Sequence, residues 1–289
     1  MISEAELRRL AAGYGVDPML LNLDYGIGWF LSAFYQVNDL KGRLRFKGGT
    51  CLRKAYFPDY RFSEDLDFTA VGALSAEQLL EWTEQAAHWA EDKDGPNFLT
   101  AEPRLELIPD EYGTETYQVR VYLRGPLRWA GSPQAIRLDV TRDEQLLLPA
   151  EIRSAIHPYS DTEVIAPANL WCYSLVEILA EKIRAIGGQR RFAISRDLYD
   201  IHRLVQAGVE VTAAIPLLKA KFAVKGLDSA SVNAQTIISR RPEFEKDWES
   251  NLVYLIPRGQ EIFFPDAWES TLTVLKHVEE KSEVSEDIR

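Results

Sequence analysis

The chain has 289 residues, 46% of them hydrophobic and 11% aromatic, and a formal net charge of −11. This composition can bury a full core in one large or two modest domains, which excludes a disordered chain. The acidic balance argues against a protein that binds nucleic acid through its overall charge. Cys51 and Cys172 have neither zinc-site nor disulfide-framework spacing, so we expect two buried thiols. The sequence has no signal-peptide core and no apolar run of about 18 residues, which indicates a cytoplasmic protein without a membrane span.

The first predicted elements are two helices within residues 1–38, because apolar residues recur at three- and four-residue steps, most clearly after Pro18. From Leu44 the pattern changes to a short strand that ends in two glycines, followed by a helix over 50–56 and a second strand that contains Leu66. This succession of strand, glycine turn, helix and strand is typical of an α/β arrangement.

The next predicted helix begins with a capping box, in which Ser75 and Gln78 satisfy each other's exposed backbone groups. Alternating hydrophobic and polar residues then predict three further strands, over 105–108, 116–123 and 135–141. We therefore expect the first part of the chain to hold the sheet.

The composition changes after Pro158, where strand patterns give way to helical ones. We place a domain boundary near residue 162, which gives a first domain of residues 1–161 and a second domain of residues 162–289.

The second domain is expected to be helical throughout. Its first helix is predicted to follow Asn169, to include Leu170 and to end at two glycines, and Ser195 has the position of an N-cap for the next helix. Further helices are predicted over 213–221, 229–239 and 268–276, and the acidic segment after Glu279 is expected to fray.

A glycine turn is the first candidate for chemistry. Gly48 and Gly49 precede a helix, so their backbone N–H groups can approach an anion that the helix N-terminus favours, and Thr50 adds a hydroxyl. Taken alone, the same residues would also suit an ordinary turn. No Walker or Gly-x-Ser-x-Gly pattern is present, which excludes P-loop NTPases and ordinary serine hydrolases.

Three carboxylates on predicted strands make the second candidate. Alternation places Asp65 and Asp67 on one face of their strand, where two like charges would repel unless a divalent cation such as Mg²⁺ lies between them. Asp139 lies on the polar face of a later strand and can complete a triad that acts on a hydroxyl or holds metal. The alternatives are a solvated strand end and, for Asp139, an acid beside Arg137.

Charged residues in the second domain form the third candidate. Lys182 lies next to the apolar face of its helix and can extend across it toward a cleft, close to Arg184, or remain a surface lysine. Asp197 and Asp200 fall in the first turns of the next helix, where acids are also favourable for structural reasons alone.

Five blocks between Lys47 and Ile201 carry a family resemblance: KGGTCLRKAY, RFSEDLDF, RLDV, AEKIRAI and RDLYDI. Together they resemble the polymerase-β-like nucleotidyltransferase superfamily, and more closely the AbiEii/MenT-type toxin nucleotidyltransferases of type IV toxin–antitoxin systems. The resemblance implies an α+β fold with a mixed sheet, N-terminal helices and a C-terminal helical domain.

The resemblance also implies an enzyme that uses Mg²⁺ and a nucleoside triphosphate, with a tRNA end as a plausible acceptor and a cognate antitoxin as partner. Metal binding would fall to Asp65, Asp67 and Asp139, and the catalytic set would add Lys182 and Asp197. The nucleotide would contact Gly48, Gly49, Thr50, Lys182, Arg184 and Asp200.

The distribution of basic residues bears on the acceptor. Residues 41–61 contain seven Lys or Arg against one acid, and residues 182–203 contain six against two, which is consistent with a triphosphate and a polyanionic acceptor. Two alternatives remain open: a nucleotidyltransferase that modifies a small molecule such as an aminoglycoside, and a nucleotide-binding interaction module without turnover.

Overall fold

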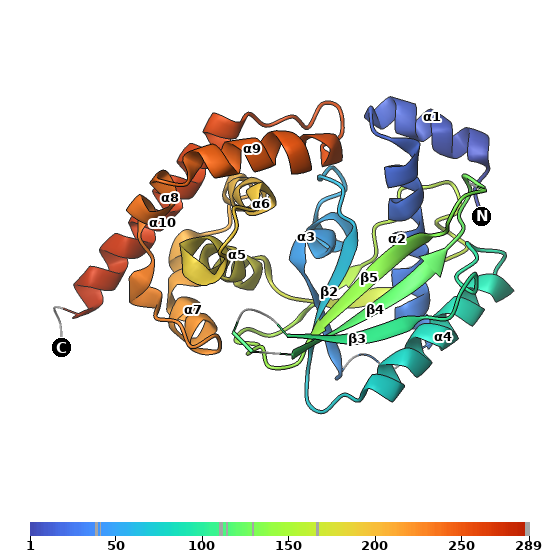
Figure 1. Cartoon of the computed structure of the whole chain (residues 1–289), viewed down its shortest axis with the longest axis horizontal. Helices are drawn as coiled ribbons and strands as arrows, with labels where there is room; N and C mark the ends of the chain where they lie inside the picture. Colours follow the sequence, from blue (N-terminus) through green and yellow to red (C-terminus); the bar gives the residue numbers. More distant parts are fainter. Residues whose placement is uncertain are drawn as a thin grey trace. The chain divides into compact units, whose positions relative to one another are not determined.

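The chain forms two compact units (Figure 1). Unit 1 comprises Met1–Asp143, Ala150–Cys172 and Leu255–Gln260, and unit 2 comprises Glu144–Pro149, Tyr173–Tyr254 and Glu261–Arg289. The computed structural model describes residues 1–37, 40, 42–109, 112–113, 115–128, 130–165 and 168–286. The domain boundary near residue 162 stays a prediction.

Unit 1 is built on a mixed sheet that has seven strands in the described part of the chain, in the order β3-β4-β5-β2-β1-β7-β6. β2 pairs in parallel with β5, and β1 in parallel with β7, whereas the other neighbours are antiparallel. The expected α+β class with a mixed sheet is therefore confirmed. The strands are β1 (Leu44–Lys47), β2 (Asp65–Ala70), β3 (Arg104–Pro109), β4 (Glu115–Leu123), β5 (Gln134–Thr141), β6 (Glu151–Ser154) and β7 (Asn169–Cys172).

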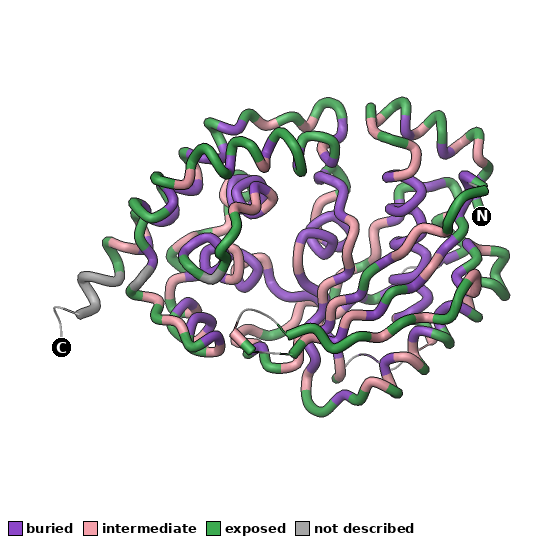
Figure 2. The backbone as a smooth tube through the Cα atoms, in the orientation of Figure 1, coloured by how far each residue is buried: buried purple, intermediate pink, exposed green. Residues whose placement is uncertain are grey.

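The helical segments of unit 1 are α1 (Glu4–Tyr14), α2 (Pro18–Val37), α3 (Gly48–Cys51) with its π-helical continuation η1 (Leu52–Tyr56), and α4 (Ala76–Asp92). Every residue of α2 from Leu20 to Phe34 is buried, which makes α2 a core helix (Figure 2). It packs against α4 and β5. Both cysteines are buried free thiols, as predicted.

The capping box at the start of α4 forms only in part. Ser75 Oγ accepts from the backbone N–H of Gln78 at 3.2 Å, as predicted. The Gln78 side chain, however, accepts from Arg43 Nη2 at 2.8 Å, so it fixes the residue before β1 to the start of α4.

A buried ion cluster joins α2 to η1. Asp24 is 1% exposed and accepts hydrogen bonds from Arg53 Nε at 2.7 Å, Lys54 Nζ at 2.8 Å and Tyr159 Oη at 2.7 Å. Burial alone would raise the pKa of Asp24, but the two cations outweigh it and hold that pKa well below its ordinary value. Arg53 and Lys54 therefore stabilise the core. They do not contribute to a basic surface, although both were counted among the basic residues of 41–61.

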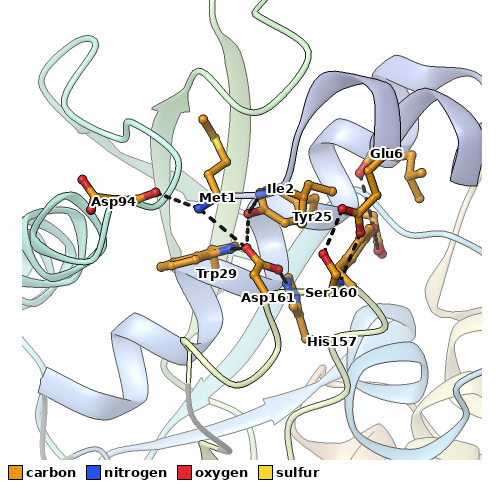
Figure 3. A network of polar contacts seen from close by, with 12 residues as sticks. Met1, Ile2, Glu6, Tyr25, Trp29, Asp94, His157, Ser160 and Asp161 are labelled. Carbon is orange, nitrogen blue, oxygen red and sulfur yellow. Dashed lines mark hydrogen bonds and ion pairs between the residues drawn. The ribbon is translucent and has the colours of Figure 1, made fainter.

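A second polar cluster fixes the segment after β6 to α2 (Figure 3). Asp161 accepts from Trp29 Nε1 at 3.1 Å and from the Tyr25 hydroxyl, and it lies 3.2 Å from His157 Nε2. The N-terminal amine donates to the carbonyl of Asp94 at 2.9 Å. The contacts of Asp161 with α2 hold the loop that carries Tyr159, and the Tyr159 hydroxyl donates to Asp24.

Unit 2 is helical in its described residues. Its helices are α5 (Leu175–Arg184), η2 (Ala185–Gln189), α6 (Ser195–Gln206), α7 (Val211–Ala223), η3 (Ser229–Ser231), α8 (Ala234–Ile238), α9 (Arg241–Asn251) and α10 (Phe264–Glu286). The short helix η4 (Val253–Leu255) leads back to unit 1. In the described residues, no helix is long and apolar enough to cross a membrane.

Two sequence predictions about this region are wrong. Leu170 lies in β7 and not in a helix, because Phe46 of β1 pairs with Cys172 and burial alternates along the strand. The helix starts only at Leu175, where Ser174 is the N-cap. The tail predicted to fray from residue 279 is helical as far as residue 286, and residues 287–289 lie outside the described residues.

We predict that Asp24→Ala lowers the free energy of unfolding by about 3–5 kcal/mol, because it leaves two buried cations without their carboxylate. Urea unfolding followed by circular dichroism measures this loss. Asp92→Ala, an exposed acid at the end of α4, is the control and should change stability by less than about 0.5 kcal/mol. Equal, small effects of both changes would show that the cluster does not hold the fold.

Candidate active site

The predicted carboxylates lie on one face of two adjacent strands in unit 1. Along β2, Asp65 and Asp67 are half-buried whereas Leu66 and Phe68 are fully buried, as alternation predicts. The parallel pairing of β2 with β5 sets Asp67 opposite Asp139. Asp67 and Asp139 are thus neighbours in register, and Asp65 lies two residues before Asp67 on the same face.

The glycine turn packs directly on this carboxylate face. β1 ends at Lys47, and Gly48 opens α3 with φ +76°, a left-handed conformation that favours glycine. A methyl group at Gly48 would overlap the Asp67 carboxylate, so this position requires glycine for space as well as for conformation. The turn and the strand predicted from sequence are therefore brought together, backbone against side chain.

Arg61 is a residue at this turn that the sequence argument did not single out, although it opens the block RFSEDLDF. Its guanidinium lies where a methyl group on Gly49 would be, and its side chain is buried while Nη1 donates to the carbonyl of Phe62 at 3.2 Å. A buried cation beside a glycine turn adds positive charge where an anion would bind. The sequence feature that could have identified Arg61 is its position four residues before Asp65, in the same block.

Thr50 has a structural contact that the sequence did not predict. Its side chain is buried, and its hydroxyl donates to the backbone carbonyl of Asp65. This bond ties α3 to the first residue of β2. A role for Thr50 in binding triphosphate stays a prediction.

Charged and polar neighbours orient the carboxylates. Arg137 Nη2 lies 2.6 Å from Asp65 Oδ1, and Gln118 Nε2 donates to Asp139 Oδ1 at 2.9 Å. Burial raises the pKa of Asp139 and the charge of Asp65 adds to this, although the Gln118 hydrogen bond acts in the opposite direction. A partly buried group of acids of this kind is favourable for binding a cation.

The donor set suits a hard divalent cation, which prefers carboxylate oxygens. As the side chains stand, no three His, Cys, Asp or Glu side chains of the described residues converge closely enough to hold a metal ion. Asp65 and Asp139 instead make the contacts with Arg137 and Gln118. The metal-binding role of Asp65, Asp67 and Asp139 therefore stays a prediction that their shared sheet face supports.

The predicted residues of unit 2 form a compact ion cluster. Lys182 Nζ lies 2.6 Å from Asp197 Oδ1 and 2.7 Å from Asp200 Oδ2, and Arg190 Nη1 lies 3.3 Å from Asp197 Oδ2. Burial alone would raise the pKa of Asp197, but Arg190 and Lys182 outweigh it and lower that pKa. α5 thus supplies the lysine, and the first turns of α6 supply both acids.

The N-terminus of α6 is capped from another helix. Ser195 is already helical, and Ile194 occupies the N-cap position without a side-chain bond, so the predicted N-cap role of Ser195 is wrong. The backbone N–H and the hydroxyl of Ser195 both donate to Asp247 Oδ2 of α9, at 2.7 and 2.6 Å. A carboxylate from α9 therefore holds the helix that carries Asp197 and Asp200.

Arg184 lies apart from this cluster. Its guanidinium binds Glu144 in a bidentate manner, at 3.1 and 2.6 Å, and donates to the carbonyl of Lys221 at 2.6 Å. Two residues along a helix correspond to a rotation of about 200°, so Arg184 and Lys182 leave α5 on different sides. The structure brings Lys182, Asp197 and Asp200 together, and it places Arg184 in a buried structural network.

We predict that Gly48→Ala lowers the free energy of unfolding by about 1–3 kcal/mol more than Gly72→Ala, as measured by urea unfolding. Gly72 has nearly the same backbone angle, φ +77°, but open space where a methyl group would lie. Gly72→Ala therefore reports only the cost of the backbone conformation, about 1–2 kcal/mol. Equal losses in the two variants would contradict the close packing of Gly48 on Asp67.

Comparison with known proteins agrees with this architecture. A solved structure of MenT4, a nucleotidyltransferase toxin from Mycobacterium tuberculosis H37Rv, is similar with a TM-score of 0.62 and 21% identity, over 96% of this chain and 90% of that one. A putative nucleotidyltransferase from H. pylori is similar with a TM-score of 0.53 and 17% identity, over 91% of this chain and 96% of that one. At these identities, the similarity shows a shared fold.

Sequence comparison identifies the family. No curated protein sequence matches the chain significantly. The family model of the nucleotidyl transferase AbiEii toxin of type IV toxin–antitoxin systems, however, matches residues 29–272, which is most of the chain and includes the carboxylate strands and the Lys182 cluster. The chain belongs to the AbiEii family of nucleotidyltransferase toxins.

Proposed function

We propose that this toxin transfers a nucleoside monophosphate from a nucleoside triphosphate to an acceptor hydroxyl and releases pyrophosphate. The observation that carries the proposal is the register of β2 and β5, which sets Asp67 beside Asp139 on the sheet face against which Gly48 packs. Carboxylates beside a glycine turn supply the two parts that phosphoryl chemistry needs, a cation site and backbone donors for phosphate.

Asp65, Asp67 and Asp139 are the residues that would hold Mg²⁺. When bound, the ion would neutralise charge on the phosphates and polarise the reacting phosphoryl group. Arg137, which holds Asp65, keeps that carboxylate on the sheet face. The acceptor hydroxyl attacks the α-phosphorus and pyrophosphate leaves, and Asp139 is the candidate carboxylate for the hydroxyl proton.

The triphosphate is assigned to the turn and to the basic residues of the matched blocks. The backbone N–H groups of Gly48 and Gly49 are the proposed phosphate donors, and the buried Arg61 guanidinium lies against Gly49. Lys182, oriented by Asp197 and Asp200, is proposed to contact the nucleotide. Arg184 is not part of this proposal, because Glu144 engages its guanidinium.

The proposed acceptor is the 3′ end of tRNA, which would place the toxin in the bacterial cytoplasm. Membership of the type IV toxin–antitoxin family supports this choice and implies a cognate antitoxin. The excess of Lys and Arg in residues 41–61 and 182–203 gives only weak support for an RNA acceptor. Three of these residues, Arg53, Lys54 and Arg184, are buried in ion pairs.

We predict that the purified protein transfers label from at least one α-labelled nucleoside triphosphate to tRNA when Mg²⁺ is present. Asp67→Asn should reduce the rate at least about 100-fold, because even the outer neighbours of metal ligands cost about 10- to 100-fold. Chelation with EDTA should abolish transfer, and added Mg²⁺ should restore it.

Asp92→Asn, at an exposed position on α4, is the control and should keep the wild-type rate. Equal transfer by wild type and Asp67→Asn would refute the assignment of the site. Label on an aminoglycoside and none on RNA would keep the chemistry but replace the acceptor.

A further inference from the structure

Unit 2 contains an open groove that the proposed chemistry does not use. α10 packs against α6 and α7, and the groove lies along these helices and the segment 261–263, with a volume of about 1010 Å³. Small-molecule sites usually span about 300–1,000 Å³, so this groove is at the upper end of that range. Its size suits part of a macromolecule.

The groove combines an apolar lining with an acidic one. The described residues that line the groove include no Lys or Arg. They include four acidic residues, all of them exposed. The acids are Glu210, Glu261, Asp266 and Glu269. The apolar lining residues are Val205, Val211, Ile262, Phe263 and Val274.

Phe263 is the most informative of the apolar residues. Its side chain is 74% exposed, although Phe264 next to it is buried against Trp268. Aromatic residues are enriched in protein interfaces, where they fill pockets of the partner. An exposed phenylalanine at the edge of an apolar groove indicates a surface that a partner covers.

One lining histidine, His202, is mostly buried, and its Nδ1 lies 2.7 Å from Ser270 Oγ. Burial lowers the pKa of His202 below its ordinary value, which disfavours a positive charge on this ring. The acidic lining therefore attracts cations and repels polyanions such as RNA or an anionic membrane.

Most of the groove wall is helical, with only Glu210 and the segment 261–263 outside the helices, and this limits the form of the partner. α6, α7 and α10 are helices, whose backbone groups are bonded within each helix, so they offer no strand edge for β-addition. An amphipathic helix can instead place its apolar face in a groove between helices and its charged residues on the rim.

We propose that this groove is a docking site for an amphipathic helix of a partner protein, one whose apolar stripe is flanked by Lys or Arg. The apolar stripe packs against Val205, Val211 and Phe263, and the basic side chains reach the carboxylates of the rim. The complementary charges raise the association rate and fix the orientation of the helix. Docking does not depend on the proposed nucleotidyl transfer.

The test uses the full-length protein and a fluorescent helical peptide of about 18 residues, with leucines at helical spacing and lysines on both sides of them. Fluorescence anisotropy should show binding that weakens as salt concentration rises. The same peptide with glutamate in place of lysine should not bind. Asp67→Asn should bind the lysine peptide as wild type does, which separates this proposal from the proposed function.

Matched variants locate the site. Glu210→Lys combined with Glu269→Lys should weaken binding by about tenfold or more, whereas Glu245→Lys combined with Glu249→Lys on α9 changes net charge equally and should have little effect. Phe263→Ser should also weaken binding by about tenfold. Because these side chains are exposed, circular dichroism should show that every variant is folded.

Three outcomes would overturn the proposal. Equal weakening by the two double variants would mean that the peptide follows net charge alone. Unchanged affinity in Phe263→Ser would show that the apolar groove is not the contact. A dimer in sedimentation that Phe263→Ser dissociates would identify a second copy of the chain as the occupant instead of a basic helix.

Discussion

The buried carboxylate of Asp24 is the interaction on which unit 1 depends. One acid serves two adjacent cations, Arg53 and Lys54, and accepts a third hydrogen bond from Tyr159. Burial lowers the pKa of Lys54 to about 8 even with Asp24 beside it, so the cluster is costly to bury and tolerates little displacement. Since both cations lie on η1, their ion pairs with Asp24 fix this helix to α2.

The position of the glycine turn depends on that ion cluster, because η1 continues directly from α3. Gly48 lies between β1, which the sheet fixes, and η1, which Asp24 fixes, so the turn has little freedom at either end. Thr50 adds a bond to the first residue of β2. The contact of Gly48 with Asp67 is therefore held from three sides, and rigid support of this kind is what a site for phosphoryl chemistry requires.

Local patterns in the sequence were enough to predict β2, β5 and the faces of Asp65, Asp67 and Asp139, because alternation acts over a few residues. Local patterns could not predict the register of the strands. Asp67 lies beside Asp139 because two strands pair whose residues are 72 positions apart in the sequence. The same limit explains the misplaced Leu170, since a four-residue strand has too few residues to show its period. Arg53 and Lys54 were counted as surface charge because their partner lies 29 and 30 residues upstream, inside an apolar helix.

The charge clusters of the two units are opposite in character. In unit 1, acids share a sheet face, and the raised pKa of Asp139 records that burial and the neighbouring Asp65 make its charged form costly. In unit 2, Lys182 is already held by Asp197 and Asp200, and Arg190 adds a cation to Asp197. A bound cation would relieve the first cluster, whereas the second is stable as it stands. The acids on the carboxylate face of unit 1 would thus be stabilised by a cation, whereas the acids of the unit 2 cluster are already paired with cations of the chain.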